Sequence, residues 1–374
     1  MPWKEEDTMS LRAEFVALAK QEGSNIRALC RRFGISSRTA YKWLKRHEQE
    51  GEVGLKDRSK RPKHQPGRTS PEMEAEVVSI RNETGWGGRK IARLLREQGF
   101  EHVPHANTVT DILRRAGKLK EEEQAKHQPF QRFERSHPNE LWQMDFKGHF
   151  ATLTGRCHPL TVLDDHSRFC LGLKACANET GLTVKTHLTA IFRQYGLPKA
   201  ILCDNGAPWG SGYPELELSE LAVWLIRLGI HPHHGRPAHP QTQGKDERFH
   251  RTLKVELLQG RSFSDLADCQ RQFDPWRDRY NLIRPHEALQ LDPPVRHYQL
   301  SERPFPEILP TVEYESGGIV RKVQSCGRVT YHDREYRVGK GLVGQYVVLR
   351  PTVTERVFDV YFCQFKVRQI SVNR

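Results

Sequence analysis

The stretch Leu141-Trp142-Gln143-Met144-Asp145-Phe146 is strand-like and carries a carboxylate near its end. A second apolar run, Ala200-Ile201-Leu202-Cys203-Asp204, also ends on a carboxylate. A third acidic residue lies one turn into the helix expected after His239-Pro240-Gln241-Thr242-Gln243-Gly244. Carboxylates delivered by two strand ends and one helix suit a pair of oxygen-loving cations, as phosphodiester chemistry requires. Because any one of the 46 acidic residues is more often solvated than a ligand, the prediction depends on all three with their flanking residues. The candidate catalytic and metal-binding residues are Asp145, Asp204 and Glu247.

The composition favours a polyanionic partner. The chain has 374 residues, enough for roughly two to three domains. Its formal net charge of +13 and pI near 9.4 are typical of proteins that bind nucleic acid. A mean hydropathy of −0.70 and the lack of any apolar run of about 18 residues exclude a transmembrane helix, and the first residues do not form a secretory signal. The eight cysteines include no C-x-x-C pair, so we expect reduced, mostly structural thiols in a cytoplasmic protein.

Residues 1–50 have the pattern of a helix-turn-helix DNA-binding domain. Leu11, Phe15, Val16 and Ala19 mark one helix, and a second over residues 25–33 would turn Ala28, Leu29 and Phe33 inward. Gly34 permits a tight turn, and Ser36-Ser37 can cap a third helix that bears Ala40, Trp43 and Leu44. A neutral packing module remains the alternative. As a recognition helix, this third helix would offer a major groove the side chains of Ser37, Arg38, Lys42 and Lys45.

Residues 51–69 are predicted to form a basic linker, without the apolar periodicity that a core needs. An extended basic arm can follow phosphates or enter a minor groove, although a merely soluble linker is the alternative. Its candidate DNA-binding residues are Arg58, Lys60, Arg61 and Lys63.

Residues 70–120 are predicted to form a second helix-turn-helix DNA-binding domain. Ser70 caps a helix with Pro71 at its first position, and Asn107 is expected to cap the last helix of the module. That last helix would turn Arg114 and Arg115 outward to DNA. Two tandem modules indicate a long or bipartite DNA site, and a linker over residues 121–137 follows them.

The chain changes character in residues 138–300. Strand-like runs cover residues 141–146, 151–153, 159–164, 169–174 and 200–203, and helices are expected over residues 180–195 and 218–228. Three antiparallel-type strands followed by alternating helix and strand predict a mixed α/β sheet with helices on its faces, an order that resembles the ribonuclease-H-like fold. A further helix is expected over residues 263–280.

The C-terminal region is predicted to form a small basic β-barrel over residues 317–374, after a linker over residues 301–316. Six strand-like runs cover residues 319–323, 328–331, 335–338, 346–350, 357–362 and 365–372. The region holds 11 Lys or Arg against 4 Asp or Glu, which suits DNA, although a packing or self-association module is the alternative.

Five segments together resemble the integrase catalytic core that retroviral integrases share with many bacterial insertion-sequence transposases of the DDE class. The resemblance covers roughly residues 138–300, and the tandem helical front end is also typical of the bacterial group. Glu247 lies 43 positions after Asp204, a longer spacing than in most of the wider family, and the excess maps to the loop over residues 207–214. The five segments are Trp142-Gln143-Met144-Asp145, Leu163-Asp164-Asp165-His166-Ser167-Arg168, Cys203-Asp204-Asn205-Gly206, His239-Pro240-Gln241-Thr242-Gln243-Gly244-Lys245-Asp246-Glu247-Arg248 and Tyr280-Asn281-Leu282-Ile283-Arg284-Pro285-His286-Glu287-Ala288-Leu289.

The resemblance implies a transposase that binds the terminal inverted repeats of a mobile element. It would cleave DNA at the element ends and join the freed 3′-OH to target DNA. It also implies two Mg²⁺ or Mn²⁺ ions per active site, with Asp145 bridging them and Asp204 and Glu247 each holding one. A homodimer or higher oligomer on double-stranded DNA is expected, in a bacterial cytoplasm and associated with the nucleoid, with no membrane partner. A catalytically silent DNA-binding regulator and a ribonuclease-H-type nuclease without strand transfer remain alternatives.

The helix around Glu247 gives further expectations. Arg251 and Lys254 follow Glu247 at i+4 and i+7, so they would share its face and hold phosphates beside the cut, unless they form only a surface salt-bridge ladder. Asp246 would point about 100° away as a solvated neighbour. Asp164 and Asp165 are expected to have a turn role rather than to bind metal.

Two other sets of residues are ambiguous. His231, His233, His234 and His239 lie in a segment that Pro232 and Pro237 make loop-like, and phosphate or DNA contact is favoured there over zinc. Trp209 and Tyr213 would either stack on bases of a distorted DNA end or pack against the core.

Overall fold

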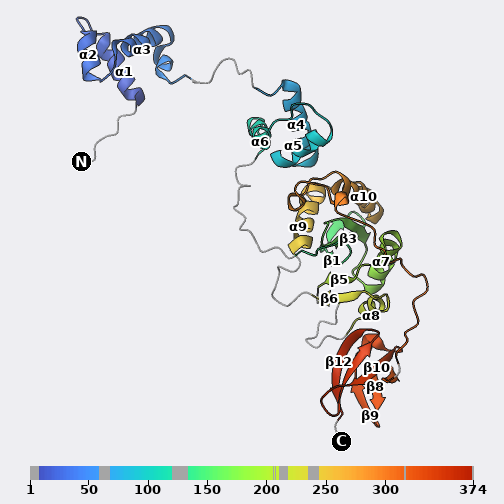
Figure 1. Cartoon of the computed structure of the whole chain (residues 1–374). Coiled ribbons are helices and arrows are strands. Elements are labelled where there is room, and N and C mark those ends of the chain that lie inside the picture. The colour runs from blue at the N-terminus through green and yellow to red at the C-terminus, as the bar shows by residue number, and fades with distance from the viewer. Residues whose placement is uncertain are drawn as a thin grey trace. The chain divides into compact units, whose positions relative to one another are not determined.

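The computed structural model describes residues 8–58, 68–119, 134–204, 206, 208–209, 218–234, 244–315 and 317–372. The chain divides into two compact units, Met1–Arg68 and Thr69–Arg374 (Figure 1). Every described helix is too short or too polar to cross a bilayer.

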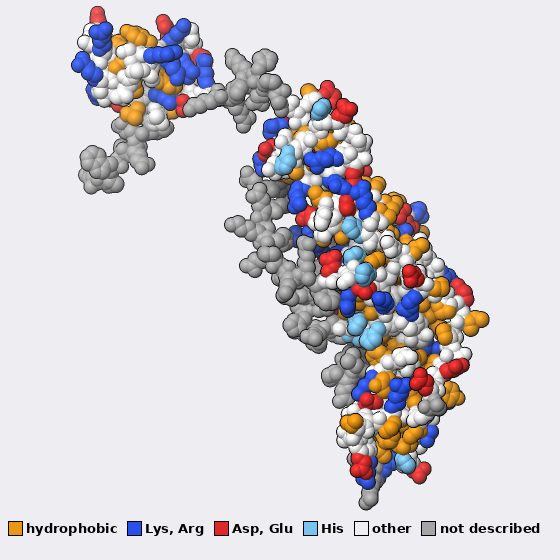
Figure 2. All heavy atoms as spheres, in the orientation of Figure 1, with side chains coloured by type: hydrophobic (Ala, Val, Ile, Leu, Met, Phe, Trp, Pro, Cys, Tyr) orange, Lys and Arg blue, Asp and Glu red, His pale blue; other side chains and the backbone are white. Residues whose placement is uncertain are grey.

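The first unit is a three-helix module, as its sequence predicts. Asn25 and Ser36 cap the second and third helices by accepting hydrogen bonds from the main-chain N–H groups of Ala28 and Thr39. Ala28 is exposed rather than inward, and Cys30 takes the buried place, because the face of the second helix follows Ile26, Leu29, Cys30 and Phe33. Basic side chains gather on this unit in Figure 2. Its elements are α1 (Thr8–Ala19), α2 (Ile26–Arg32), α3 (Ser37–Glu50) and the 3-10 turn η1 (Gly51–Leu55).

The second helical module opens the second unit with α4 (Pro71–Thr84), α5 (Gly88–Glu97) and α6 (Ala106–Arg115). The cap at Ser70 is confirmed, because its hydroxyl accepts from the N–H of Met73. The cap of α6 is His105 and not Asn107. The chain is already helical at Ala106, so Asn107 instead donates its own N–H to the His105 ring.

This module contacts residues 256–296 of the same unit, which the sequence pattern did not indicate. Trp86 Nε1 donates to Glu256 Oε1 at 3.3 Å, and Arg93 Nη2 lies 2.7 Å from Asp292 Oδ1. Arg296 Nη2 in turn lies 3.0 Å from Glu97 Oε1.

The centre of the second unit is a six-stranded mixed sheet in the order β2-β3-β1-β5-β6, with β4 paired to β3. The pairs β1–β3, β2–β3 and β3–β4 are antiparallel, whereas β1–β5 and β5–β6 are parallel. This arrangement agrees with the expected ribonuclease-H-like order. The strands are β1 (Trp142–Phe146), β2 (Phe150–Thr152), β3 (Gly155–Asp164), β4 (Cys170–Cys176), β5 (Ala200–Cys203) and β6 (His231–His234).

The strand β6 corrects the loop expected around Pro232. Pro232 pairs with Ile201 on the outermost strand of the sheet, where a missing N–H donor is tolerated because only one side of the strand needs partners.

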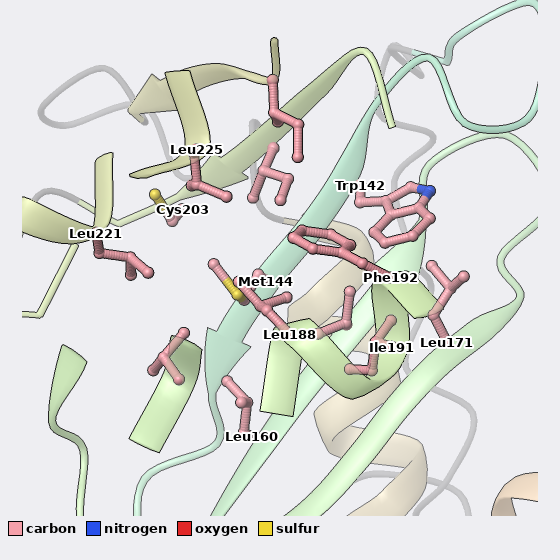
Figure 3. Packing of buried hydrophobic residues seen from close by; sticks show 14 of the residues in the cluster. Trp142, Met144, Leu160, Leu171, Leu188, Ile191, Phe192, Cys203, Leu221 and Leu225 are labelled. Carbon is pink, nitrogen blue, oxygen red and sulfur yellow. The ribbon is translucent and has the colours of Figure 1, made fainter. Parts of the chain in front are cut away.

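Two hydrophobic clusters cover the two faces of this sheet. Trp142 and Met144 of β1 pack with Phe192 of α7 (Gly181–Tyr195) and Leu225 of α8 (Glu220–Arg227), as Figure 3 shows. On the other face, β3 and β4 pack against α9 (Gly244–Leu253) and α10 (Leu266–Leu282). Because successive side chains of a strand alternate between faces, Gln143 and Asp145 point toward α9.

Short helical turns connect the sheet to the C-terminal region. The π-helical turn η4 (Lys254–Leu258) follows α9 directly, and the 3-10 turns η5 (Glu287–Leu289) and η6 (Pro294–Arg296) follow α10. The helix predicted over residues 263–280 is present as α10, displaced toward the C-terminus.

The C-terminal region contains the six predicted strands, but the described residues form two small sheets and do not show the predicted closed barrel. Four strands form the sheet β12-β11-β10-β7, and β8 pairs only with β9. Ala222, Val223 and Ile226 of α8 join the core of this region, so a helix covers apolar surface that a barrel would have to enclose. The elements are β7 (Ile319–Lys322), β8 (Arg328–Tyr331), β9 (Arg334–Arg337), the 3-10 turn η7 (Lys340–Leu342), β10 (Tyr346–Pro351), β11 (Val357–Phe362) and β12 (Phe365–Ser371).

Candidate active site

The candidate carboxylates lie toward the same end of the central strands β1 and β5. Gln143 of β1 pairs with Leu202 of β5, so the parallel register, continued two residues further, places Asp145 beside Asp204. Glu247 is exposed in the first turn of α9, the helix that packs over the face to which Asp145 points.

The electrostatics of Asp145 show that the three groups influence one another. Burial raises the pKa of the Asp145 carboxyl to about 6, and the negative charges of Asp204, Glu179 and Glu247 also raise that pKa. The N–H of Phe146 donates to Asp145 Oδ1 at 2.8 Å and opposes the rise. A bound cation would reduce the electrostatic repulsion between neighbouring carboxylates. Carboxylate oxygens are also the ligands that hard divalent metals prefer, so these residues fit such an ion.

The carboxylates do not form a closed ligand cage. Within the described ranges, no group of three or more His, Cys, Asp or Glu side chains is placed to hold a metal ion as it stands. Most of the chain between Asp204 and Leu218, and residues 235–243 before α9, lie outside those ranges.

Asp246 is buried, which contradicts the solvated position expected for it. Its exposed fraction is 1%, because Asp246, Phe249 and Leu253 form the face of α9 that lies on the sheet. Both of its carboxylate oxygens lack a hydrogen-bond partner among the described residues. Burial, reinforced by Asp145 and Asp165, raises the pKa of Asp246 well above its ordinary value.

Asp164 has the turn role expected for it. Its Oδ1 accepts from Ser167 N at 2.8 Å and from Ser167 Oγ at 2.6 Å, and its Oδ2 accepts from Asn139 N at 2.7 Å. These contacts close the turn between β3 and β4.

Asp165 does more than the predicted turn. Its carboxylate is completely buried and lies 2.5 Å from Lys245 Nζ of α9. It also accepts from Gln143 Nε2 at 2.7 Å and from the N–H of Arg135 at 2.9 Å. A single buried carboxylate thus joins β1 to the first turn of α9.

His250 is a residue of the site that the sequence motifs did not predict. Its Nδ1 lies 4.0 Å from Asp145 Oδ2, and its Nε2 lies 2.9 Å from Thr161 Oγ1. Burial lowers the pKa of His250 to about 4, and the charge of Lys147 contributes, so the ring is neutral near pH 7. The signal was its position three residues after Glu247, which places both on neighbouring turns of one helix.

Three cationic side chains lie close in sequence to the carboxylates. Arg251 and Lys254 are exposed, and the π-helical turn η4 begins at Lys254 instead of a continued α-helix. Lys147, which the sequence did not predict as a DNA-binding residue, belongs with these two residues. Burial lowers the pKa of Lys147, and the nearby charge of Lys254 lowers it further.

Trp209 packs against the core, which decides between the two alternatives left open for it. Its ring stacks on Phe146 with centroids 5.6 Å apart, and it is 4% exposed.

His231 and His233 have their rings 4.5 Å apart on β6. Five other predicted residues lie outside the described residues: Lys60, Arg61, Lys63, Tyr213 and His239.

The predicted DNA readers of the helical modules are at the surface. Ser37, Arg38, Lys42 and Lys45 are exposed on α3. Three others form ion pairs: Arg58 with Glu50, Arg114 with Asp111, and Arg115 with Glu74 at 2.8 Å.

Comparison with known protein families supports this organisation. Residues 135–240 and 228–294 each match a model described as an integrase core domain. Residues 11–63 match a helix-turn-helix domain, and residues 39–113 match a homeodomain-like domain. Residues 319–373 match the C-terminal domain of IS481 family transposases.

Similar proteins come from bacterial insertion elements. An uncharacterized 39.2 kDa protein of element IS476 from Xanthomonas euvesicatoria is 29% identical over 216 residues, which are 56% of this chain and 60% of that protein. An uncharacterized 31.7 kDa protein of element IS407 from Burkholderia multivorans is 30% identical over 152 residues, 41% of this chain and 52% of that protein. The chain thus spans less than two thirds of the length of these curated relatives.

Among solved structures, a match to the simian T-cell lymphotropic virus intasome spans 79% of this chain and 100% of the matched chain. Its TM-score is 0.39 and its sequence identity is 17%. This likeness is too weak to define the fold by itself.

The matches thus identify an integrase core domain on the mixed sheet, preceded by helix-turn-helix modules. More particularly, the C-terminal match is to IS481 family transposases and the similar proteins belong to bacterial insertion elements, so the chain is similar to insertion-sequence transposases.

Proposed function

We propose that this chain is a DDE transposase that cleaves DNA at the ends of a mobile element and joins the freed 3′-OH to target DNA. The observation that carries the proposal is the placement of Asp145 and Asp204 at the ends of the adjacent strands β1 and β5 of an integrase core, where burial, with the nearby charges of Asp204, Glu179 and Glu247, raises the pKa of Asp145. Structural acidic residues are normally paired with cations, whereas carboxylates gathered against one another favour a metal-binding role.

Asp145, Asp204 and Glu247 would hold two Mg²⁺ or Mn²⁺ ions, with Asp145 shared between them. Bound there, such ions supply Lewis-acid activation of the attacking hydroxyl group and of the scissile phosphate. The chain itself needs no covalent nucleophile. His250 stays neutral beside Asp145 and leaves that carboxylate without a competing cation.

The basic side chains around the site would hold the DNA backbone. Arg251 and Lys254 are exposed on the chain that follows Glu247, and Lys147 lies two residues after Asp145 and near Lys254, so these cations would bind phosphates on either side of the cut. Binding by these residues would be insensitive to base sequence, because phosphates are the same at every step.

The helical modules would supply the recognition of the terminal inverted repeats. Exposed polar and basic side chains on α3 suit the base edges of a major groove, and the helix-turn-helix match supports this use. A homodimer or higher oligomer is proposed, because two element ends must be processed together for one element to move.

The test uses the full-length protein with labelled element ends, a plasmid target and Mg²⁺. Cleavage at the end followed by appearance of the label in the plasmid is expected, and EDTA should abolish both. Specific binding of ends without cleavage at any Mg²⁺ or Mn²⁺ concentration would instead identify a catalytically silent regulator. Cleavage without transfer of the label would identify a nuclease.

A further inference from the structure

The helix that carries Glu247 is fastened to the sheet at two points, one on each side of that residue. Lys245, two residues before Glu247, pairs with Asp165 directly after β3. His250, three residues after Glu247, contacts Thr161 within β3. Both attachments therefore reach the same strand.

The first attachment also reaches the strand of Asp145. Lys245 Nζ lies 2.5 Å from Asp165 Oδ1 and donates to the Asp165 main-chain oxygen at 3.1 Å. Asp165 accepts in addition from Gln143, which lies two residues before Asp145 on β1 and hence on the same face. Asp165 consequently connects the strand that bears Asp145 with the helical turn that bears Glu247.

The second attachment ends at Asp145 itself. Thr161 pairs with Asp145 across β1 and β3, and its hydroxyl donates to the Asp145 main-chain oxygen at 3.0 Å. With that proton committed, the hydrogen-bond network assigns the Nε2–H of His250 as the donor to Thr161 Oγ1. His250 Nδ1 then faces Asp145 Oδ2 at 4.0 Å.

The spacing of the two attachments restrains the helix. Lys245 and His250 are about 7.5 Å apart along the axis and about 140° apart around it, by the rise and turn of an α-helix. A helix held at one such point can still roll or pivot, whereas two points on different sides prevent both motions. The restraint matters because the first turn of a helix is held by fewer backbone hydrogen bonds than its middle.

We propose that Lys245 and His250, held by Asp165 and Thr161, are positioning residues that set α9 over β1 and so present Glu247 to the ions that Asp145 would hold. This rests on the proposed function, because it takes Glu247 to be a metal ligand. Neither residue touches the DNA or the ions. Their loss weakens metal binding and leaves the binding of DNA ends unchanged.

The experiment measures Mn²⁺ binding to the full-length protein by electron paramagnetic resonance, in which the signal of the free ion decreases as Mn²⁺ binds. Gel shifts measure the binding of labelled DNA ends by the same variants. Lys245→Met alone leaves the Asp165 charge buried and unpaired, which threatens folding. The double variant Lys245→Met with Asp165→Asn removes both charges, and His250→Phe removes the second attachment with a ring of similar size. Lys199→Met, which breaks the exposed pair with Glu140, is the matched control.

The double variant and His250→Phe should each weaken Mn²⁺ binding about 10–100-fold, as is typical when the support of a metal ligand is lost. Their half-saturating Mg²⁺ concentration for cleavage should rise in parallel, while end binding and the Lys199→Met control stay within about twofold of wild type. Unchanged Mn²⁺ binding in both variants, with Asp145→Asn deficient, overturns the positioning role alone. A loss of end binding with normal Mn²⁺ binding overturns it too, since Lys245 or His250 would then contact DNA. Normal Mn²⁺ binding in Asp145→Asn overturns the proposed metal site itself.

Discussion

Asp246 and Glu247 are neighbours in the first turn of α9, yet Asp246 is buried against the sheet and Glu247 is exposed. The difference arises because adjacent residues of a helix point about 100° apart, so only one of the pair can join Asp145 and Asp204 at the sheet edge. The buried neighbour has no hydrogen-bond partner for either oxygen among the described residues. Its pKa is raised well above the ordinary value by burial, which favours a neutral acid in the folded protein.

Glu247→Gln is expected to abolish strand cleavage, whereas Asp246→Asn should keep most of it. Each variant removes one carboxylate from the same turn, so each is the matched control for the other. Asn reproduces the shape of a neutral Asp246, while Gln at 247 removes a proposed metal ligand. The assay uses a pre-cut end with Mg²⁺. An active Glu247 variant beside an inactive Asp246 variant would move the site by one residue along the helix.

Asp145→Asn is expected to remove cleavage and joining but to leave end binding nearly intact. The carboxylate is assigned to metal and lies at a strand end, where Asn fits the same space and still accepts from the N–H of Phe146. Gel shifts and single-turnover joining are compared side by side. Joining at the wild-type rate in Mg²⁺ would contradict the two-metal assignment.

Lys254→Ala is expected to be intermediate. Lys254 is exposed beside Lys147, so its loss should weaken the grip on DNA ends and reduce the slope of log binding constant against log salt by about one. Metal binding should not change. Lys199→Ala, another exposed lysine in the same unit, serves as the control, and an equal effect of the two would argue against a specific phosphate contact at Lys254.

Arg38→Ala combined with Lys42→Ala should reduce the preference for true element ends over scrambled DNA. Both side chains are exposed on α3, and a lost base contact of this kind costs about 1–3 kcal/mol of discrimination. Competition gel shifts measure the preference. If the specific and scrambled ends were weakened equally, these residues would be phosphate contacts rather than readers of sequence.

Lys90→Met should stabilise the protein below pH 8. Burial of Lys90 lowers its pKa to about 8, and the charge of Arg284 adds to the effect. The unfolded chain therefore holds this proton up to a higher pH than the folded chain does. The cost of burying the charged lysine is fully present below pH 8 and is relieved as the pH rises from there toward the ordinary lysine pKa. The excess of the variant Tm over the wild-type Tm should be largest at pH 7 and shrink by pH 10, and an excess that does not depend on pH would contradict the titration of Lys90.

Local sequence patterns were sufficient to predict the elements whose formation depends on residues close together in the chain. The caps at Ser36 and Ser70, the strands that carry Asp145 and precede Asp204, and the helix that carries Glu247 all follow from short-range propensity and hydrophobic periodicity. The residues that flank the three carboxylates then predicted them as a set, because carboxylates delivered by two strand ends and a helix suit a pair of divalent cations.

Features that depend on contact with a segment distant in the sequence were not predictable in this way. Pro232 is tolerated in a strand because that strand is at the sheet edge, and α8 of the central region packs into the core of the C-terminal strands. Trp209 is buried because Phe146 lies beside it.

The amino-acid sequence by itself determined the order of the domains, the mixed sheet and the identity of the candidate carboxylates. Only the tertiary structure decided which residues surround them: it buried Asp246, paired Lys245 with Asp165, and brought His250 to Asp145. The physical reason is that helical and strand periodicity specify which side chains share a face, whereas burial and ion pairing depend on which distant segment covers that face.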